Sequence, residues 1–114
     1  ISTEPLSNSL PLTLGRLKHG VLLQNYPNPF NAETWIPFKL IIPGRVTLHI
    51  YDLRGRLVNT MAIGNHLAGD FSVKSRAVHW NGHNLHDEPV SSGTYVYVLD
   101  VSGQKHTRKL TVLE

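Results

Sequence analysis

The run from Gly93 to Val101 is dense in aromatic and β-branched residues, and it narrows the folds open to this chain more than any other segment. Such side chains fit a pleated, half-buried surface, so the run is typical of a β-strand. Ser102-Gly103-Gln104 then predicts a tight turn that leads back into a strand over Lys105–Leu113. A hairpin is only marginally stable by itself, so the rest of the chain must supply further strands.

Shorter segments upstream show the same two-residue period. Val46, Leu48 and Ile50 fall on one face of a predicted strand, and polar residues alternate with them. The segment Thr34–Leu40 also alternates, but it contains Pro37, which indicates an edge position or a bulge. These patterns predict strands with one face in a core.

Turn residues punctuate the segments at short intervals. The clearest signals are Pro43-Gly44, the hairpin Asp52–Gly55 and the polar loop from Asn81 to Pro89. The run from Phe71 to Trp80 is predicted to be one further strand, with a kink near Ser75-Arg76. Six or seven short strands without a convincing helix after residue 21 predict an all-β fold, and the even spacing favours a sandwich over a barrel.

The first twenty residues read differently. Ser, Thr, Asn and Pro dominate the start, so we expect a linker or arm over residues 1–20 and one folded domain over residues 21–114. The chain has no cysteine, which excludes disulfides and thiolate chemistry. A net charge of +3, spread along the chain, gives no nucleic-acid patch. Ile1 and the missing signal peptide predict a piece of a longer protein.

Five segments carry a resemblance to a known family: Leu22–Asn31, Ile50–Val58, Trp80–Asn84, Pro89–Tyr95 and Arg108–Leu113. Taken in this order, they resemble the C-terminal sorting domain of cargo proteins of the type IX secretion system. A similar layout occurs in the immunoglobulin-like domain of the flagellar hook-capping protein. The resemblance implies an immunoglobulin-like β-sandwich of about seven strands.

The same resemblance implies a function. Such a domain is a non-catalytic signal that directs an exported bacterial protein across the outer membrane. Its partners would be the outer-membrane secretion machinery, a surface peptidase that removes it, and the cargo domain that precedes it in the parent chain. The localisation would be the periplasm in transit and then the cell surface or the medium, with no nucleic acid and no membrane span.

Two positions depart from the family pattern. Ala32 stands where the family usually has proline, and Asp87 stands where it usually has glycine. Because Asp87 carries a β-carbon, we expect a turn there that does not need a positive φ.

The final strand and the one before it are where the resemblance places recognition by the secretion machinery. Polar residues on both faces early in the Lys105–Leu113 segment indicate weak burial there, and its lysines are typical of an edge strand that resists unwanted pairing. An edge strand also remains available for strand addition by a partner. The residues predicted to be read are Gly93, Tyr95, Tyr97, Lys105, Arg108, Lys109, Leu110 and Val112.

The chain is rich in histidine, and His79, His83 and His86 fall close together beside Asp87. They are weak candidates for a metal site, because their spacing matches no strong zinc motif and the loop does not have the calcium-binding register of an EF-hand. No serine, histidine and carboxylate pattern indicates a nucleophile elbow. We therefore expect no enzyme activity, no cofactor and no resident metal.

A function of another class stays open at this point. Trp35, Tyr51, Tyr95 and Tyr97 are candidates for an aromatic platform, as in a carbohydrate- or surface-binding accessory module. Trp80 ends a predicted strand and is expected to pack into the core instead. A third possibility is a structural spacer that only positions a neighbouring catalytic domain.

Overall fold

A computed structural model describes residues 19–113, and every regular element in that range is a β-strand. The all-β prediction is confirmed, with nine strands in place of about seven. The predicted arm lies outside the described residues except for His19 and Gly20. The strands are β1 (Gly20–Leu22), β2 (Thr34–Ile36), β3 (Phe38–Leu40), β4 (Gly44–Tyr51), β5 (Leu57–His66), β6 (Gly69–Phe71), β7 (Val78–Trp80), β8 (Gly93–Val101) and β9 (Gln104–Val112).

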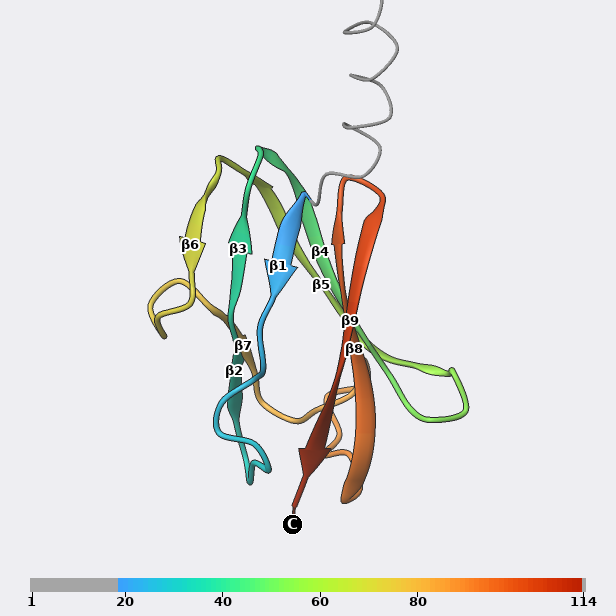
Figure 1. Ribbon diagram of the computed structural model, residues 1–114. Helices are drawn as coiled ribbons and strands as arrows, with labels where there is room; N and C mark the ends of the chain where they lie inside the picture. Colours follow the sequence, from blue (N-terminus) through green and yellow to red (C-terminus); the bar gives the residue numbers. More distant parts are fainter. Residues whose placement is uncertain (1–18, 114) are drawn as a thin grey trace, which may run out of the picture.

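The strands form two layers of a sandwich (Figure 1). One layer is a four-stranded antiparallel sheet in the order β5-β4-β8-β9, which contains the longest strands. The other layer consists of a three-stranded sheet, β1-β3-β6, and a two-stranded sheet, β2-β7. This arrangement agrees with the expected immunoglobulin-like sandwich.

Pro37 marks the point where one strand changes sheet. The residues before it pair with β7 and those after it pair with β1 and β6. A proline has no backbone donor, so it fits such a break in the ladder. Its carbonyl still accepts a hydrogen bond from the Leu23 amide at 3.1 Å. Pro37 therefore marks the point at which the chain leaves one sheet of the layer and joins the other. The sequence predicted only an edge position or a bulge there.

The prediction of one strand from Phe71 to Trp80 is wrong. The structure has two short strands, β6 and β7, on different sheets. Between them, the amides of Arg76 and Ala77 both donate to the carbonyl of Val73, at 2.9 and 2.7 Å, and this closes a turn. The turn takes the chain from β6, which pairs with β3, to β7, which pairs with β2. This segment therefore changes sheet, as the β2–β3 segment does at Pro37.

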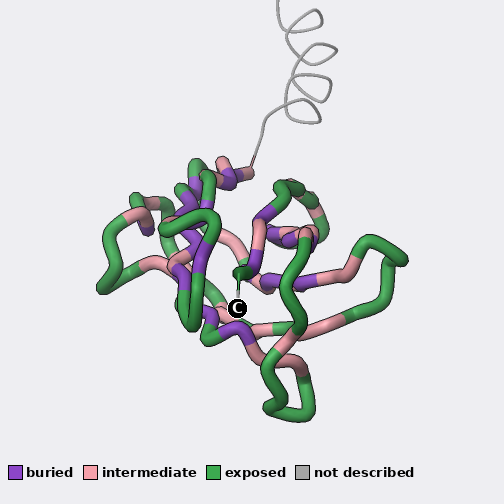
Figure 2. Tube along the Cα trace, turned by 90° about the horizontal axis from the view of Figure 1, so that it is seen from below, coloured by how far each residue is buried: buried purple, intermediate pink, exposed green. Residues whose placement is uncertain are grey.

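Alternate residues of the long strands fill the space between the layers. Leu48, Ile50, Tyr97 and Leu99 are fully buried, while their neighbours along each strand are only partly buried. In Figure 2 the buried segments lie between the layers and the exposed segments form the loops around them. This burial of apolar surface is the main stabilising contribution of the fold, which has no disulfides.

The turn that contains Phe30 packs against the last strand of the domain. Its peptide bonds before Pro27 and Pro29 are cis. The Phe30 ring is buried and meets Trp80 edge to face, with 5.5 Å between ring centroids. The Phe30 amide donates to the Thr111 carbonyl at 3.0 Å, and its carbonyl accepts from the Leu113 amide at 2.8 Å. The turn therefore lies against the end of β9.

The expectation about Asp87 is wrong, because its φ is +59°. The cause is a loop built around Asn84. Its side-chain oxygen accepts from the amides of His86 and Glu88, at 2.9 and 3.0 Å, and its carbonyl accepts from the Asp87 amide at 3.0 Å. These bonds hold Asp87 in the left-handed region, which aspartate tolerates better than most residues with a β-carbon. Ala32 also has a positive φ, of +80°, which a proline ring could not adopt.

Candidate recognition surface

Half of the residues predicted to be read by the machinery belong to the core. Tyr97 and Leu110 are 0% and 1% exposed, and Tyr95 and Val112 are only slightly more so. They alternate along β8 and β9 and face the opposite layer. In the folded domain these four side chains hold the final hairpin in place, and they present almost no surface to a partner.

The other half is exposed. Gly93, Lys105, Arg108 and Lys109 all lie at the surface of the final hairpin. Strand β9 carries three basic side chains and no carboxylate. The Arg108 guanidinium also reaches across to β1, where its Nε donates to the Leu22 carbonyl at 2.7 Å. The hairpin therefore presents a positively charged strand whose apolar residues face inward.

Strand β9 lies at the edge of its sheet, as predicted, but part of that edge is covered. Towards the end of the strand, the Lys109 carbonyl accepts from the side chain of Gln24 at 3.0 Å, and the Thr111 amide donates to that of Asn28 at 3.0 Å. Phe30 covers the Thr111 carbonyl, as described above. Because outward backbone groups alternate along a strand, the next ones belong to Thr107 and Lys105. Among the described residues, no group outside the hairpin bonds to the backbone of Lys105 or Thr107.

Tyr97 ties this hairpin to the beginning of the domain. Its hydroxyl donates to the Leu23 carbonyl at 2.8 Å and accepts from the Asn25 amide at 3.0 Å. Burial raises the pKa of the Tyr97 hydroxyl above its ordinary value, and the Asn25 hydrogen bond and the Arg108 charge oppose that rise. The neutral hydroxyl is thus the form that the fold requires.

A second surface, which the sequence reasoning missed, is a groove of about 770 Å³ at one end of the sandwich. The turn between β4 and β5 forms one wall, and the loop from Asn84 to Gly93 forms the other. Leu53 and Leu57 lie on the first wall and are 66% and 45% exposed. Aliphatic residues in and beside a tight turn were the signal that could have indicated this groove.

The metal candidates do not converge. The Nε2 of His79 lies 2.7 Å from Glu33 Oε1, and the Nδ1 of His83 lies 2.8 Å from Asp87 Oδ1. The side chain of His86 is exposed on the loop. Across residues 19–113, no three His, Cys, Asp or Glu side chains come together as metal ligands would.

The predicted aromatic platform does not form, because Tyr95 and Tyr97 are buried. Trp35 is partly exposed on β2, but the Lys74 ammonium lies 4.2 Å from its ring centroid and the His79 ring lies 5.2 Å away. A sugar ring would have to displace the lysine to stack on that face. Trp80, in contrast, is 1% exposed, as expected of a core residue.

Residues 24–113 match the family model described as the secretion system C-terminal sorting domain. The chain belongs to this family. The resemblance carried by the motifs is therefore confirmed, and the family is one of sorting signals, not of enzymes. No curated protein is similar enough to match this sorting domain.

Two solved structures, of PorZ and PorU, share the fold of the sorting domain. A structure of PorZ, described as an essential surface component of the type IX secretion system of Porphyromonas gingivalis, aligns with a TM-score of 0.56 at 21% identity over 80% of this chain. Dimeric latent PorU from the same organism aligns with a TM-score of 0.58 at 21% identity over 86%. FLGD from P. aeruginosa aligns less well, with a TM-score of 0.46 at 24% identity over 64% of this chain and 53% of that one.

The sorting domain spans only a small part of the first two structures, 11% of the PorZ chain and 10% of the PorU chain. Within its described residues, it has no helix of the length and hydrophobicity that crossing a bilayer requires.

Proposed function

We propose that this sorting domain directs a longer exported protein from the periplasm through a type IX outer-membrane machinery to the cell surface or the medium. The domain itself contributes recognition and no catalysis. A surface peptidase then separates it from its cargo. The family match over residues 24–113 is the observation that carries the proposal, and the fold likeness to PorZ and PorU agrees with it.

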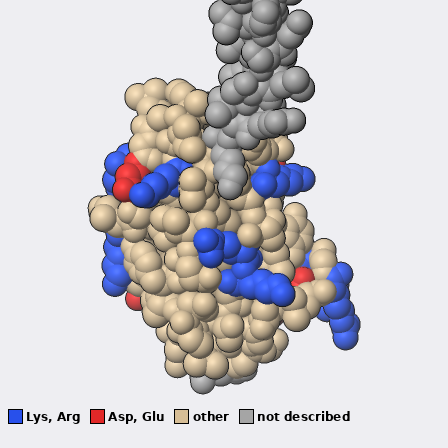
Figure 3. All heavy atoms as spheres, in the orientation of Figure 1, with Lys and Arg blue, Asp and Glu red and all other residues tan. Residues whose placement is uncertain are grey.

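We further propose that the machinery reads the exposed half of the final hairpin, which consists of Gly93, Lys105, Arg108 and Lys109. The buried residues beside them fix the shape of that surface. Complementary charge gives a partner both orientation and a faster encounter, and three cations on one strand supply it. Figure 3 shows Lys and Arg side chains at several places on the visible face and few Asp or Glu side chains.

The outward backbone groups of Lys105 and Thr107, which have no partner among the described residues, add a second means of recognition. The backbone groups of Lys105 and Thr107 lie where an extended segment of the partner could pair with the sheet. Strand addition supplies main-chain hydrogen bonds, and the neighbouring lysines supply specificity for an acidic segment. This supports a contact centred on the first half of β9.

The experiment is a secretion assay. Residues 1–114 are fused to the C-terminus of a periplasmic reporter in a host with the machinery, and Lys105→Glu and Lys109→Glu are introduced together. Both side chains are exposed, so the fold should persist, which a thermal melt of each purified domain checks. We expect surface reporter to fall at least tenfold.

The matched control is Lys74→Glu with Arg76→Glu, which makes the same change in net charge on the exposed turn between β6 and β7. Because Lys74 and Arg76 lie over the rings of Trp35 and Phe71, the thermal melt must also show that this control stays folded. This control should export as well as the unchanged domain. If the reporter with the β9 reversals reaches the surface as efficiently as the control, recognition by the charged face of β9 is wrong. If even the unchanged domain leaves the reporter in the periplasm, the sorting role itself fails.

A further inference from the structure

Apart from Gly93, the residues of the groove between the β4–β5 turn and the Asn84–Gly93 loop take no part in the sorting proposal. Its floor and walls expose more apolar surface than a turn and a loop require. Leu53, Leu57 and Leu85 are 66%, 45% and 54% exposed around it, and Val58 and Val90 lie half-buried between them. Clustered exposed leucines mark a binding surface more often than leucines scattered singly.

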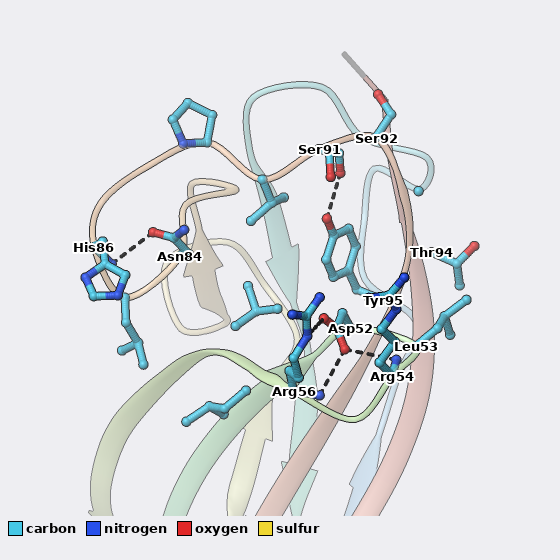
Figure 4. Close-up of a pocket in the computed structure, with 16 residues that line it drawn as sticks. Asp52, Leu53, Arg54, Arg56, Asn84, His86, Ser91, Ser92, Thr94 and Tyr95 are labelled. Atoms are coloured by element: carbon cyan, nitrogen blue, oxygen red, sulfur yellow. Dashed lines mark hydrogen bonds and ion pairs between the residues drawn. The ribbon is translucent and has the colours of Figure 1, made fainter.

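Both walls of the groove are held in place by hydrogen bonds (Figure 4). On the turn, the Asp52 carboxylate accepts from the amides of Arg54 and Arg56, each at 2.9 Å, and from the Arg56 side chain at 3.0 Å. On the loop, the Tyr95 hydroxyl donates to the Ser91 carbonyl at 2.7 Å. A surface that is already ordered loses little conformational entropy when it binds a partner.

The two walls are also tied to each other. The Leu85 amide donates to the Val58 carbonyl at 2.9 Å, and the Asn59 side chain donates to the His83 carbonyl at 2.7 Å. The Trp80 indole donates to the same His83 carbonyl at 2.9 Å. The loop is thus fastened to strand β5 and to the core, and the distance between the walls is fixed by the fold.

The charge of the groove is positive. Two arginines and one aspartate line it. Asp52 pairs with Arg56, whereas the Arg54 guanidinium has no hydrogen bond or ion pair with any residue that the structure describes. Figure 4 shows Arg54 on the turn beside Leu53. An unpaired guanidinium beside exposed leucines matches a ligand that combines a carboxylate with an aliphatic side chain.

We propose that this groove binds a short extended peptide segment of a partner protein, in which aliphatic side chains alternate with carboxylates. The aliphatic side chains pack on Leu53, Leu57 and Leu85, and one carboxylate pairs with Arg54. The groove lies at the surface between the β4–β5 turn and the Asn84–Gly93 loop, where an extended peptide can lie along it.

The position of the groove agrees with this assignment. Two of the segments that carry the family resemblance, Ile50–Val58 and Pro89–Tyr95, supply most of its lining. Backbone geometry accounts for Asp52 and Gly55 in the first segment, because they close the turn. Backbone geometry does not explain why the side chains of Leu53 and Leu57 are exposed, whereas contact with a peptide ligand explains it.

The test is a titration of the ¹⁵N-labelled chain with three capped pentapeptides, followed by NMR. The peptides are Leu-Glu-Leu-Glu-Leu, its charge-swapped form Leu-Lys-Leu-Lys-Leu, and its apolar-free form Ser-Glu-Ser-Glu-Ser. We expect the first to shift the amide signals of residues 52–58 and 84–95. The other two should bind at least tenfold more weakly, because each lacks one of the two complementary features.

Variants then separate the contributions. Arg54→Glu should weaken binding of the first peptide at least tenfold, and Leu85→Ser should weaken it severalfold. Both side chains are exposed, so the melting temperature should stay close to that of the unchanged chain. The matched control is Arg45→Glu, which reverses an exposed arginine at the far end of β4 and should leave binding unchanged.

Three results would overturn the proposal. The three peptides could bind equally, the shifts could fall outside the groove, or Arg54→Glu could bind as well as the control. If the amide signals of the groove shift with protein concentration when no peptide is present, the occupant of the groove is a second copy of the chain and the peptide proposal is wrong. None of these results bears on export through β9, so the two proposals fail separately.

Discussion

Replacing Tyr97 by phenylalanine removes one oxygen atom from the centre of the domain. The hydroxyl satisfies the Asn25 amide, which is buried, and the Leu23 carbonyl, which is half-buried. Each buried polar group left without a partner costs about 1–3 kcal/mol. The fully buried amide and the less buried carbonyl together give an expected loss of about 2–4 kcal/mol in the free energy of unfolding. For a domain of this size, that lowers the melting temperature by about 10 °C or more.

The assay is urea unfolding at pH 7, followed by the fluorescence of the two tryptophans. The midpoint should fall while the slope of the transition stays the same, because the surface exposed on unfolding hardly changes. Tyr51→Phe is the matched control. Tyr51 lies on the outer face of β4, and its hydroxyl has no hydrogen bond to a described residue, so its loss should change stability by less than about 0.5 kcal/mol.

The dependence on pH gives a second check of the same reasoning. Because the pKa of Tyr97 is raised in the fold, its stabilising contribution is complete below the ordinary tyrosine pKa and is lost as the pH rises through the higher folded value. The difference in stability between the unchanged chain and Tyr97→Phe should therefore narrow above about pH 10. A folded Tyr97→Phe variant that loses less than about 0.5 kcal/mol at pH 7, or a difference that widens with pH, would refute the assigned hydrogen bonds.

Three further substitutions test other parts of the structure. Ala32→Gly should stabilise the domain by about 1 kcal/mol in urea unfolding, since a positive φ disfavours a β-carbon, whereas Ala62→Gly within β5 should destabilise it. Asp52→Asn should be less stable than the unchanged chain at pH 7 and equally stable in acid. Hydrogen bonds from Arg56 lower the pKa of Asp52, and that stabilisation disappears as the pH falls through the lowered value. Trp80→Phe should cost about 2–3 kcal/mol, measured the same way, because it leaves a cavity and removes one of the two hydrogen bonds to the His83 carbonyl.

The strand pattern alone was enough for the fold class. In β4 and β8 a two-residue period decides which side chains are buried, and the observed burial follows it along both strands. What the period could not decide was which sheet a short strand joins. The runs through Pro37 and through Val73 each divide between two sheets, and that division depends on partners far away in the sequence.

The loop around Asp87 shows a different limit. A residue-by-residue rule favours a negative φ for any side chain with a β-carbon, and the rule fails here because Asn84 organises the surrounding backbone. The groove was missed for a related reason. Leu53 and Leu85 lie far apart in the sequence, and hydrogen bonds made in the fold, from Leu85 to Val58 and from Asn59 to His83, bring their walls together.

For the proposed recognition surface, the sequence pointed to the final hairpin but could not divide it into residues that form the core and residues that are exposed. Leu110 and Val112 close the core, while Lys105 and Lys109 on the same strand face the solvent. Deleting the end of the chain would remove both kinds of residue at once, so a loss of export after deletion would be explained equally by unfolding. Reversing the two exposed charges leaves the core intact. A loss of export in that variant, with an unchanged melting temperature, can only come from the surface that β9 presents to its partner.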